Sequence, residues 1–105
     1  MLINSRKFDI RIWVLVTQDH NCHLFKEGYV RMSSYNYTID NDSISKRAVH
    51  LTNIAIQKLD RNYGLKEDGN ILSFNQATQI TGVDFHGLMR GPIRNSIETS
   101  IAAVR

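Results

Sequence analysis

The stretch Phe-Asp-Ile-Arg-Ile-Trp-Val-Leu-Val-Thr, residues 8–17, decides the fold because its side chains alternate in character. One set of alternate positions is wholly apolar: Phe8, Ile10, Ile12, Val14 and Val16. The other set begins with two charged residues and ends with two apolar ones: Asp9, Arg11, Trp13 and Leu15. A period of two in a segment rich in β-branched and aromatic residues predicts a β-strand with one face in the core.

Two shorter segments extend this strand into a predicted antiparallel meander. Residues 22–25 and 29–32 have strand character, and the polar residues 18–21 and the Lys-Glu-Gly sequence at 26–28 predict the turns that connect them. We therefore place the strands within residues 6–33.

The segments that follow the strands predict a long loop and an irregular stretch. Residues 33–46 are mostly polar and lack periodicity, which is typical of functional or mobile loops. Residues 48–58 predict an extended entry, a turn at Thr52-Asn53 and a short helical turn, and residues 59–70 are polar again, so their charged side chains, Glu67 among them, are expected in solvated loops.

The last third of the chain predicts two helices, at residues 73–81 and 84–104. Ser73 followed by Gln76 matches a capping box, and Gly82 ends that helix. In the second helix Pro92 removes a backbone donor, which predicts a kink or a break. The fold class is therefore α+β: an antiparallel β-meander followed by helices.

Composition excludes several classes of protein. The 105 residues contain 13 Lys and Arg against 10 Asp and Glu, a net charge of +3. Apolar runs are far shorter than the roughly 18 residues that span a bilayer, which argues against a membrane protein. The basic residues are dispersed, which argues against a nucleic-acid-binding tract. The single Cys22 permits no internal disulfide and favours a reducing, cytosolic setting.

Three charges in strand alternation form the first candidate site. Lys7, Asp9 and Arg11 share one face, and two interpretations are open: a solvent-facing edge with an ion pair worth about 0–1 kcal/mol, or a charged floor for an anionic ligand with Asp9 accepting from hydroxyls. Arg31, in the third predicted strand, would join Arg11 as a clamp for a carboxylate or phosphate, or else cover apolar surface with its stem.

A second candidate is the sequence His50-Leu51-Thr52-Asn53, close to Lys58. Its polar side chains can donate to phosphate oxygens or coordinate around Mg²⁺, or they can hold a turn through local bonds to the backbone. The histidines are too scattered for a metal site, so we expect no metal ligands within this chain.

Three motifs, taken in order, resemble the tubulin tyrosine ligase family: RKFDIRIWVLV at residues 6–16, EGYVR at 27–31, and HLTNIAIQK at 50–58. The resemblance implies an ATP-grasp-like fold and a ligase that adds tyrosine, glutamate or glycine to tubulin through an acyl-phosphate, with ATP and Mg²⁺. It implies a cytoplasmic, cytoskeletal location, such as a cilium or axoneme, and tubulin or microtubules with acidic tails as partners.

The resemblance also implies roles for individual residues. Nucleotide-contacting positions would be Lys7, Asp9, His50, Leu51, Thr52 and Asn53. Catalytic positions near the phosphates would be Arg11 and Arg31, and the substrate-binding positions would be Arg11, Arg31 and Lys58.

The resemblance leaves two functions open. The family's Glu-x-Asn magnesium motif is absent after residue 58, where Glu98 is followed by Thr99 and Ser100. We therefore expect a central fragment of the ligase domain that works with the rest of that domain, binds Mg²⁺ through residues outside this chain, and is inactive alone. The alternative is a catalytically incomplete structural or microtubule-associated subunit that retains the ligase-like fold.

Overall fold

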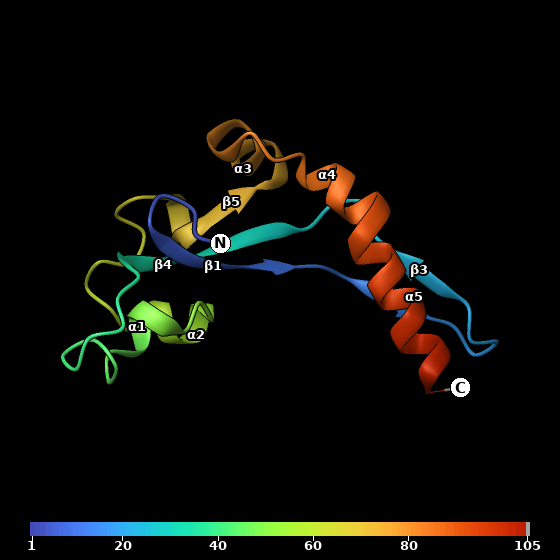
Figure 1. Cartoon of the computed structure of the whole chain (residues 1–105), viewed down its shortest axis with the longest axis horizontal. Coiled ribbons are helices and arrows are strands. Elements are labelled where there is room, and N and C mark those ends of the chain that lie inside the picture. Colours follow the sequence, from blue (N-terminus) through green and yellow to red (C-terminus); the bar gives the residue numbers. More distant parts are fainter. Residues whose placement is uncertain (105) are drawn as a thin grey trace.

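Two antiparallel sheets and a series of helices make up the computed structural model, which describes residues 1–104 (Figure 1). A three-stranded sheet has the order β1-β4-β5, and a two-stranded sheet pairs β2 with β3. The strands are β1 (Arg6–Arg11), β2 (Val14–Val16), β3 (Cys22–Leu24), β4 (Tyr29–Asn36) and β5 (Ile71–Ser73). The predicted class of antiparallel sheets followed by helices is confirmed.

The strands form one long ribbon, and the predicted meander order is wrong, because β4 pairs with β1 and β5 rather than with β3. Residues 26–28 therefore connect β3 to β4 without the predicted tight turn. The alternating segment that opens the chain forms β1 and β2 in series, and the chain then returns past it as β3 and β4. Val14 pairs with Leu24 in the outer part of the ribbon, and Asp9 pairs with Arg31 in the inner part. The closing turn is fixed by the Thr17 amide, which donates to the Asn21 carbonyl at 2.8 Å.

β4 continues four residues beyond the predicted end of the third strand, to Asn36. The reason is burial: Ser33 and Ser34 lie under the short helices that follow, and both are less than 5% exposed. Polar composition alone made this part of the chain resemble a loop, whereas each serine has hydrogen-bond partners in those helices.

The helices are short until the end of the chain. They are α1 (Arg47–His50), α2 (Ile54–Gln57), the 3₁₀ turn η1 (Asp68–Asn70), α3 (Phe74–Thr81), α4 (Phe85–Leu88), the π-helical turn η2 (Met89–Ile93) and α5 (Arg94–Ala103). In Figure 1, α1 and α2 lie on one side of the β1–β4 ribbon, and α5 crosses the β2–β3 end. Within the part of the chain that the structure describes, no helix is long and apolar enough to cross a membrane.

The capping box predicted for α3 is confirmed. The Gln76 amide donates to Ser73 Oγ at 3.1 Å, and the Ser73 amide donates to Gln76 Oε1 at 2.9 Å, so two orphan donors of the first turn are satisfied. Gly82 follows with φ of 74°, the left-handed conformation that commonly ends a helix. The helix therefore starts directly at the end of β5.

Pro92 neither breaks nor ends its helix. The residue lies inside η2, and the backbone stays helical from Leu88 before the turn to Arg94 after it. A π-helical turn changes the local hydrogen-bond spacing, so the missing Pro92 donor is accommodated and α5 continues.

The core lies between the sheet and the C-terminal helices. Its centre is the stacked pair Phe74 and Phe85, whose ring centroids are 6.0 Å apart. The buried members are Ile3, Val30, Met32, Leu72, Phe74, Ala77, Phe85 and Met89, with Phe8, Ile10 and Ile12 of the alternating segment packed against them. The predicted apolar face of that segment is therefore correct as far as Ile12, whereas Val14 and Val16 in β2 are exposed.

Candidate functional site

The Asp9 carboxylate is the point at which the three sequence motifs meet. Arg31 Nε donates to Asp9 Oδ1 at 2.6 Å, and Arg31 Nη2 donates to Asp9 Oδ2 at 2.7 Å. Thr52 Oγ1 donates to the same Oδ2 at 2.6 Å. Cross-strand pairing explains the first contact, because Asp9 and Arg31 lie directly opposite each other in β1 and β4. The convergence joins residues that lie up to 43 positions apart in the sequence.

This geometry holds both partners of the ion pair in their charged forms. Burial by itself raises the pKa of the Asp9 carboxyl, but the hydrogen bonds from Arg31 and Thr52, together with the charges of Arg31 and Arg11, outweigh burial, and the net pKa is lowered. The hydrogen bond to Asp9 raises the pKa of Arg31. The carboxylate is already well supplied with donors, so a ligand hydroxyl would have to compete with Thr52 for it.

The cations predicted beside Asp9 are exposed. Lys7 and Arg11 are solvent-accessible residues of β1, and the alternation of a strand places them on the same face as Asp9. Arg11 lies opposite Tyr29 in β4 and lowers the pKa of Asp9 by its charge. The Asp9 carboxylate is therefore paired with Arg31 and also lies within the influence of the Arg11 charge, while Lys7 lies at the register shift between Arg6 and Phe8.

Only one side chain of the HLTN segment reaches this cluster. Thr52 is buried and bonds Asp9, while Leu51 is exposed. The His50 ring lies 2.9 Å from the Ser43 carbonyl oxygen through Nε2 and faces the edge of Tyr37. Asn53 is an exposed residue at the start of α2, and its carbonyl accepts from the Ile56 and Gln57 amides. Lys58, at the end of α2, is exposed.

Arg6 and Glu67 form a buried ion pair that sequence reasoning missed. The Arg6 side chain is 3% exposed and the Glu67 side chain 11%, and Arg6 Nη1 donates to Glu67 Oε2 at 3.0 Å and to the Ser33 carbonyl at 2.8 Å. Arg6 Nη2 also bonds Glu67 Oε1. Burial lowers the pKa of Arg6.

The placement of Glu67 in a solvated loop is therefore wrong, because the loop folds back onto β1 and brings the carboxylate to Arg6. A signal for the pair was present in the sequence. Arg6 is in phase with Phe8 and Ile10, on the apolar face of the strand, where a charge needs a buried partner.

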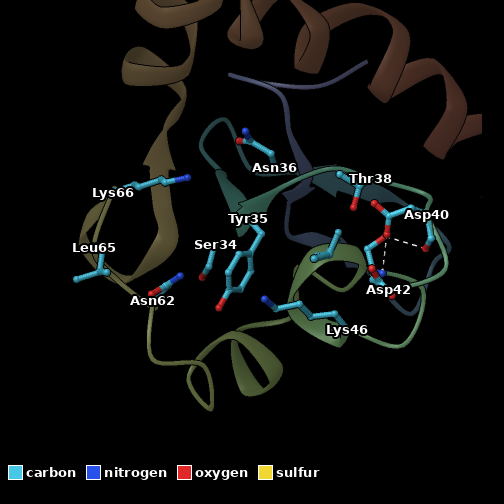
Figure 2. Close-up of a pocket in the computed structure, with 12 residues that line it drawn as sticks. Ser34, Tyr35, Asn36, Thr38, Asp40, Asp42, Lys46, Asn62, Leu65 and Lys66 are labelled. Atoms are coloured by element: carbon cyan, nitrogen blue, oxygen red, sulfur yellow. Dashed lines mark hydrogen bonds between the residues drawn. The ribbon is translucent and has the colours of Figure 1, made fainter.

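Two hollows in the surface lie away from the Asp9 cluster. The first, of about 610 Å³, is bordered by the end of β4 and the loop before α1, and Figure 2 shows Lys46 beside the Tyr35 ring there. The Lys46 ammonium lies 3.7 Å from that ring's centroid, and Tyr35 donates to Asp60 at 2.7 Å. The second, of about 590 Å³, lies between β3 and the helices η2 and α5. Neither hollow is lined by the residues predicted for the nucleotide.

A metal site of protein ligands alone is not formed by the described residues. Among residues 1–104, no group of three or more His, Cys, Asp or Glu side chains is placed to hold a metal ion. At the centre of the candidate site, the one carboxylate is held by Arg31 and Thr52. The donor set there does not fit Mg²⁺, which prefers several oxygen ligands in octahedral geometry.

The lowered pKa values predict a loss of stability in acid. Burial raises the pKa of Asp60, but hydrogen bonds from Tyr35 and from the Asn62 amide, together with the charges of Lys46 and Arg61, outweigh burial and lower it. The pKa of Asp9 is lowered in the same way. Carboxyls with a lower pKa in the folded state stabilise it above their unfolded pKa, and this stability is lost as pH falls through the folded pKa. We expect the urea midpoint to fall steeply below about pH 4. The Asp9→Asn variant should show a shallower fall than the parent, and equal slopes for the two proteins would contradict the role of Asp9.

Comparison with known proteins gives one family and several relatives. The tubulin-tyrosine ligase family model matches residues 1–104. A probable tubulin polyglutamylase TTLL9 of Mus musculus is 41% identical over 68 residues, which cover 63% of this chain and 14% of the relative. A probable alpha-tubulin polyglutamylase Ttll1 of Tetrahymena thermophila is 38% identical over 71 residues, covering 66% of this chain and 17% of the relative.

A third relative carries a different activity in its name. Tubulin glycylase 3D of Tetrahymena thermophila is 44% identical over 81 residues, covering 75% of this chain and 7% of the relative. The matched segment is thus a small part of each of these three longer proteins. Since the family model covers nearly the whole sequence, the chain belongs to the tubulin-tyrosine ligase family.

Proposed function

We propose that this chain is part of an ATP-dependent ligase that adds tyrosine, glutamate or glycine to tubulin through an acyl-phosphate. The observation that carries the proposal is the convergence of the three motifs on Asp9, with Lys7, Arg11 and Arg31 on the same ribbon face. The relatives are named as tubulin polyglutamylases and a tubulin glycylase, which supports tubulin as the substrate.

The charges on this face suit a nucleotide triphosphate. In phosphoryl transfer to a carboxylate, the protein contributes chiefly by positioning the reactants and by stabilising negative charge. Arg11 and Arg31 would stabilise the charge on the transferred phosphoryl group and bind the carboxylate substrate. Lys7 and Asp9, with His50, Leu51, Thr52 and Asn53, would contact the nucleotide, and Lys58 would lie on the substrate side.

Asp9 would act mainly by orienting Arg31. Two of the Arg31 nitrogens, Nε and Nη2, bond the carboxylate, so the plane of the guanidinium is fixed while Nη1 takes no part in the pair. A fixed guanidinium needs little reorganisation when it meets a phosphate or carboxylate oxygen. Because the donor set around Asp9 does not fit Mg²⁺, we place the metal ligands in the rest of the ligase domain.

The proposal includes a cellular setting. It places the protein in the cytoplasm on the cytoskeleton, in a cilium or axoneme among other sites, with the acidic tail of tubulin as its partner. The alternative is a structural or microtubule-associated subunit that retains this fold. In such a subunit the Asp9–Arg31 pair would only stabilise the pairing of β1 with β4, and the protein would not bind nucleotide.

Equilibrium binding of a fluorescent ATP analogue with Mg²⁺ separates these two functions. We expect saturable binding, weakened about tenfold or more by Lys7→Ala and by Arg31→Ala, because each removes one cation, worth about 1.4 kcal/mol or more, from the phosphate site. Arg94→Ala is the matched control, since Arg94 is an exposed arginine of α5 paired with Glu98. Binding that is absent, or lowered equally by all three substitutions, would favour the structural subunit.

A further inference from the structure

Gln57 is a completely buried polar residue whose side-chain amide is saturated with hydrogen bonds. It is the last residue of α2 and is 0% exposed. Nε2 donates to the Leu51 carbonyl at 2.5 Å and to the Ala48 carbonyl at 2.9 Å. Oε1 accepts from the Ser34 amide at 3.0 Å, from Ser34 Oγ at 2.8 Å and from Asn70 Nδ2 at 3.2 Å. Donors and acceptors on both sides fix the orientation of the amide.

The two carbonyls that Gln57 holds belong to the end of α1. The last carbonyls of a helix have no partner within it, and a short helix such as α1 depends on outside donors for them. Leu51 is the residue at which the chain leaves α1 with extended backbone angles, and Thr52 follows directly. The position of the Leu51 carbonyl therefore determines where the Thr52 side chain points.

The other side of the Gln57 amide is attached to β4. Ser34 lies three residues after Arg31 in the same strand. One amide thus connects the strand that carries Arg31 with the segment that carries Thr52, and both of those side chains bond Asp9. A displacement of about 1 Å at such a support is enough to disrupt the positioning of catalytic groups.

We propose that Gln57 is the positioning residue of the candidate site, which sets the distance between the Thr52 hydroxyl and the Asp9–Arg31 pair. Gln57 does not contact Asp9, Arg31 or Thr52 through its side chain, and it acts on Thr52 through its hydrogen bond to the Leu51 carbonyl. This role rests on the proposed function in one respect: Thr52 and the Asp9–Arg31 pair, which Gln57 positions, are groups that we propose to contact the nucleotide and substrate.

An NMR titration of the Asp9 side-chain carboxyl carbon tests the role without any nucleotide. Thr52→Val should raise the pKa of that carboxyl by about half a pH unit or more, because a hydrogen bond to the charged form is lost. Gln57→Met, which keeps the length of the side chain but removes its amide, should raise it by a similar amount. In the double variant the two effects should not add, since both act through the same hydrogen bond.

Asn70→Gly is the matched control. Asn70 is buried in the same network and has a φ of 57°, which glycine adopts readily. This substitution removes the donors to Met32, Ser34 and Gln57 but leaves both Gln57 bonds to the α1 carbonyls in place. We expect it to lower the melting temperature and to leave the pKa of the Asp9 carboxyl unchanged.

If Gln57→Met folds, either of two results would overturn the proposal: the parental pKa at Asp9, or additive effects of Gln57→Met and Thr52→Val. If Gln57→Met does not fold, Gln57→Glu replaces it, because it keeps the incoming bonds from Ser34 and Asn70. If the charge of the new glutamate changes the pKa of the Asp9 carboxyl, the change also occurs in a Thr52→Val variant. If Gln57 acts by positioning Thr52, the change disappears when Thr52 is replaced by valine. Failure of both Gln57 variants to fold, beside a folded Asn70→Gly, would limit Gln57 to folding and also overturn the role. Absence of nucleotide binding would refute the proposed function alone.

Discussion

The Arg6→Met substitution is expected to lower the free energy of unfolding by about 3–5 kcal/mol. The guanidinium lies almost fully buried between Glu67 and the Ser33 carbonyl. Methionine fills part of the volume but leaves the Glu67 carboxylate in a buried place without its cation, and it removes the donor to Ser33. Urea unfolding followed by circular dichroism measures the loss, with the slope of the transition as a check on two-state behaviour.

Arg94→Met provides the control for the loss of an arginine as such. Arg94 donates to Glu98 at 3.0 Å on the exposed surface of α5, and such pairs one helical turn apart contribute about 0.3–0.5 kcal/mol. The double variant Arg6→Met with Glu67→Leu should recover about 1 kcal/mol or more, because the unpaired carboxylate is gone. If Arg6→Met costs no more than Arg94→Met, the buried pair does not hold the loop before β5 in place.

The second large effect is expected for Gly28→Ala, at about 3 kcal/mol of unfolding free energy. Gly28 lies between β3 and β4, and an added Cβ would overlap the carbonyl oxygen of Arg11 and approach Phe74 Cζ to 2.9 Å and Ile12 Cγ2 to 3.3 Å. Neither a strand backbone nor a buried ring moves without cost. The glycine of the EGYVR motif is thus required for close approach of the chain to β1, rather than for a left-handed turn.

The same substitution should also displace the candidate site. Arg11 is the residue whose carbonyl would be pushed, so amide chemical shifts should change at Arg11 and at its register partner Tyr29. Gly91→Ala is the control, because apart from its chain neighbours and its own helix backbone nothing lies within 4 Å of a Cβ added there. Alanine favours a helix over glycine, but its Cβ also meets the ring of the following Pro92, so we expect this change to cost much less than Gly28→Ala. Equal melting temperatures for the two alanine variants would contradict the overlap.

The features that could be predicted from the sequence are those that depend on residues close together in the chain. The alternation of Phe8, Ile10 and Ile12 and the capping box of Ser73 depend on near neighbours, and the structure confirms both. The meeting of Asp9, Arg31 and Thr52 requires the register of β1 against β4 and the path of the chain after α1, which no local period contains. Strand alternation predicted that Arg31 would join the face of Asp9 and Arg11, whereas only the resemblance to a family added Thr52 to the same site.

The residues that the sequence did not predict to be buried are polar residues whose hydrogen-bond partners lie far away in the chain. Gln57 and Asn70 look like ordinary surface residues in sequence, because amides show burial only through what they bond. The prediction of a solvated loop at Glu67 is wrong because its partner, Arg6, is distant in the sequence. Arg6 lies on the apolar face of its strand, where a charge needs a buried partner, and this was the available signal. The extent of β4 was underestimated because serines under a helix resemble serines in a loop.

The arrangement of β1 and β2 in series against β4 and β3 has a consequence for the order of folding. A ribbon of this kind forms by closing its turn, here between Thr17 and Asn21, and then pairing outward, since each further pair closes only a short additional loop. Asp9 and Arg31, 22 residues apart, meet as part of that pairing. Contacts with residues 71–73 in β5 close much longer loops and form later. We therefore expect the ion pair at the centre of the candidate site to be among the early contacts of the folding chain, and Thr52 to join it after β4 has paired.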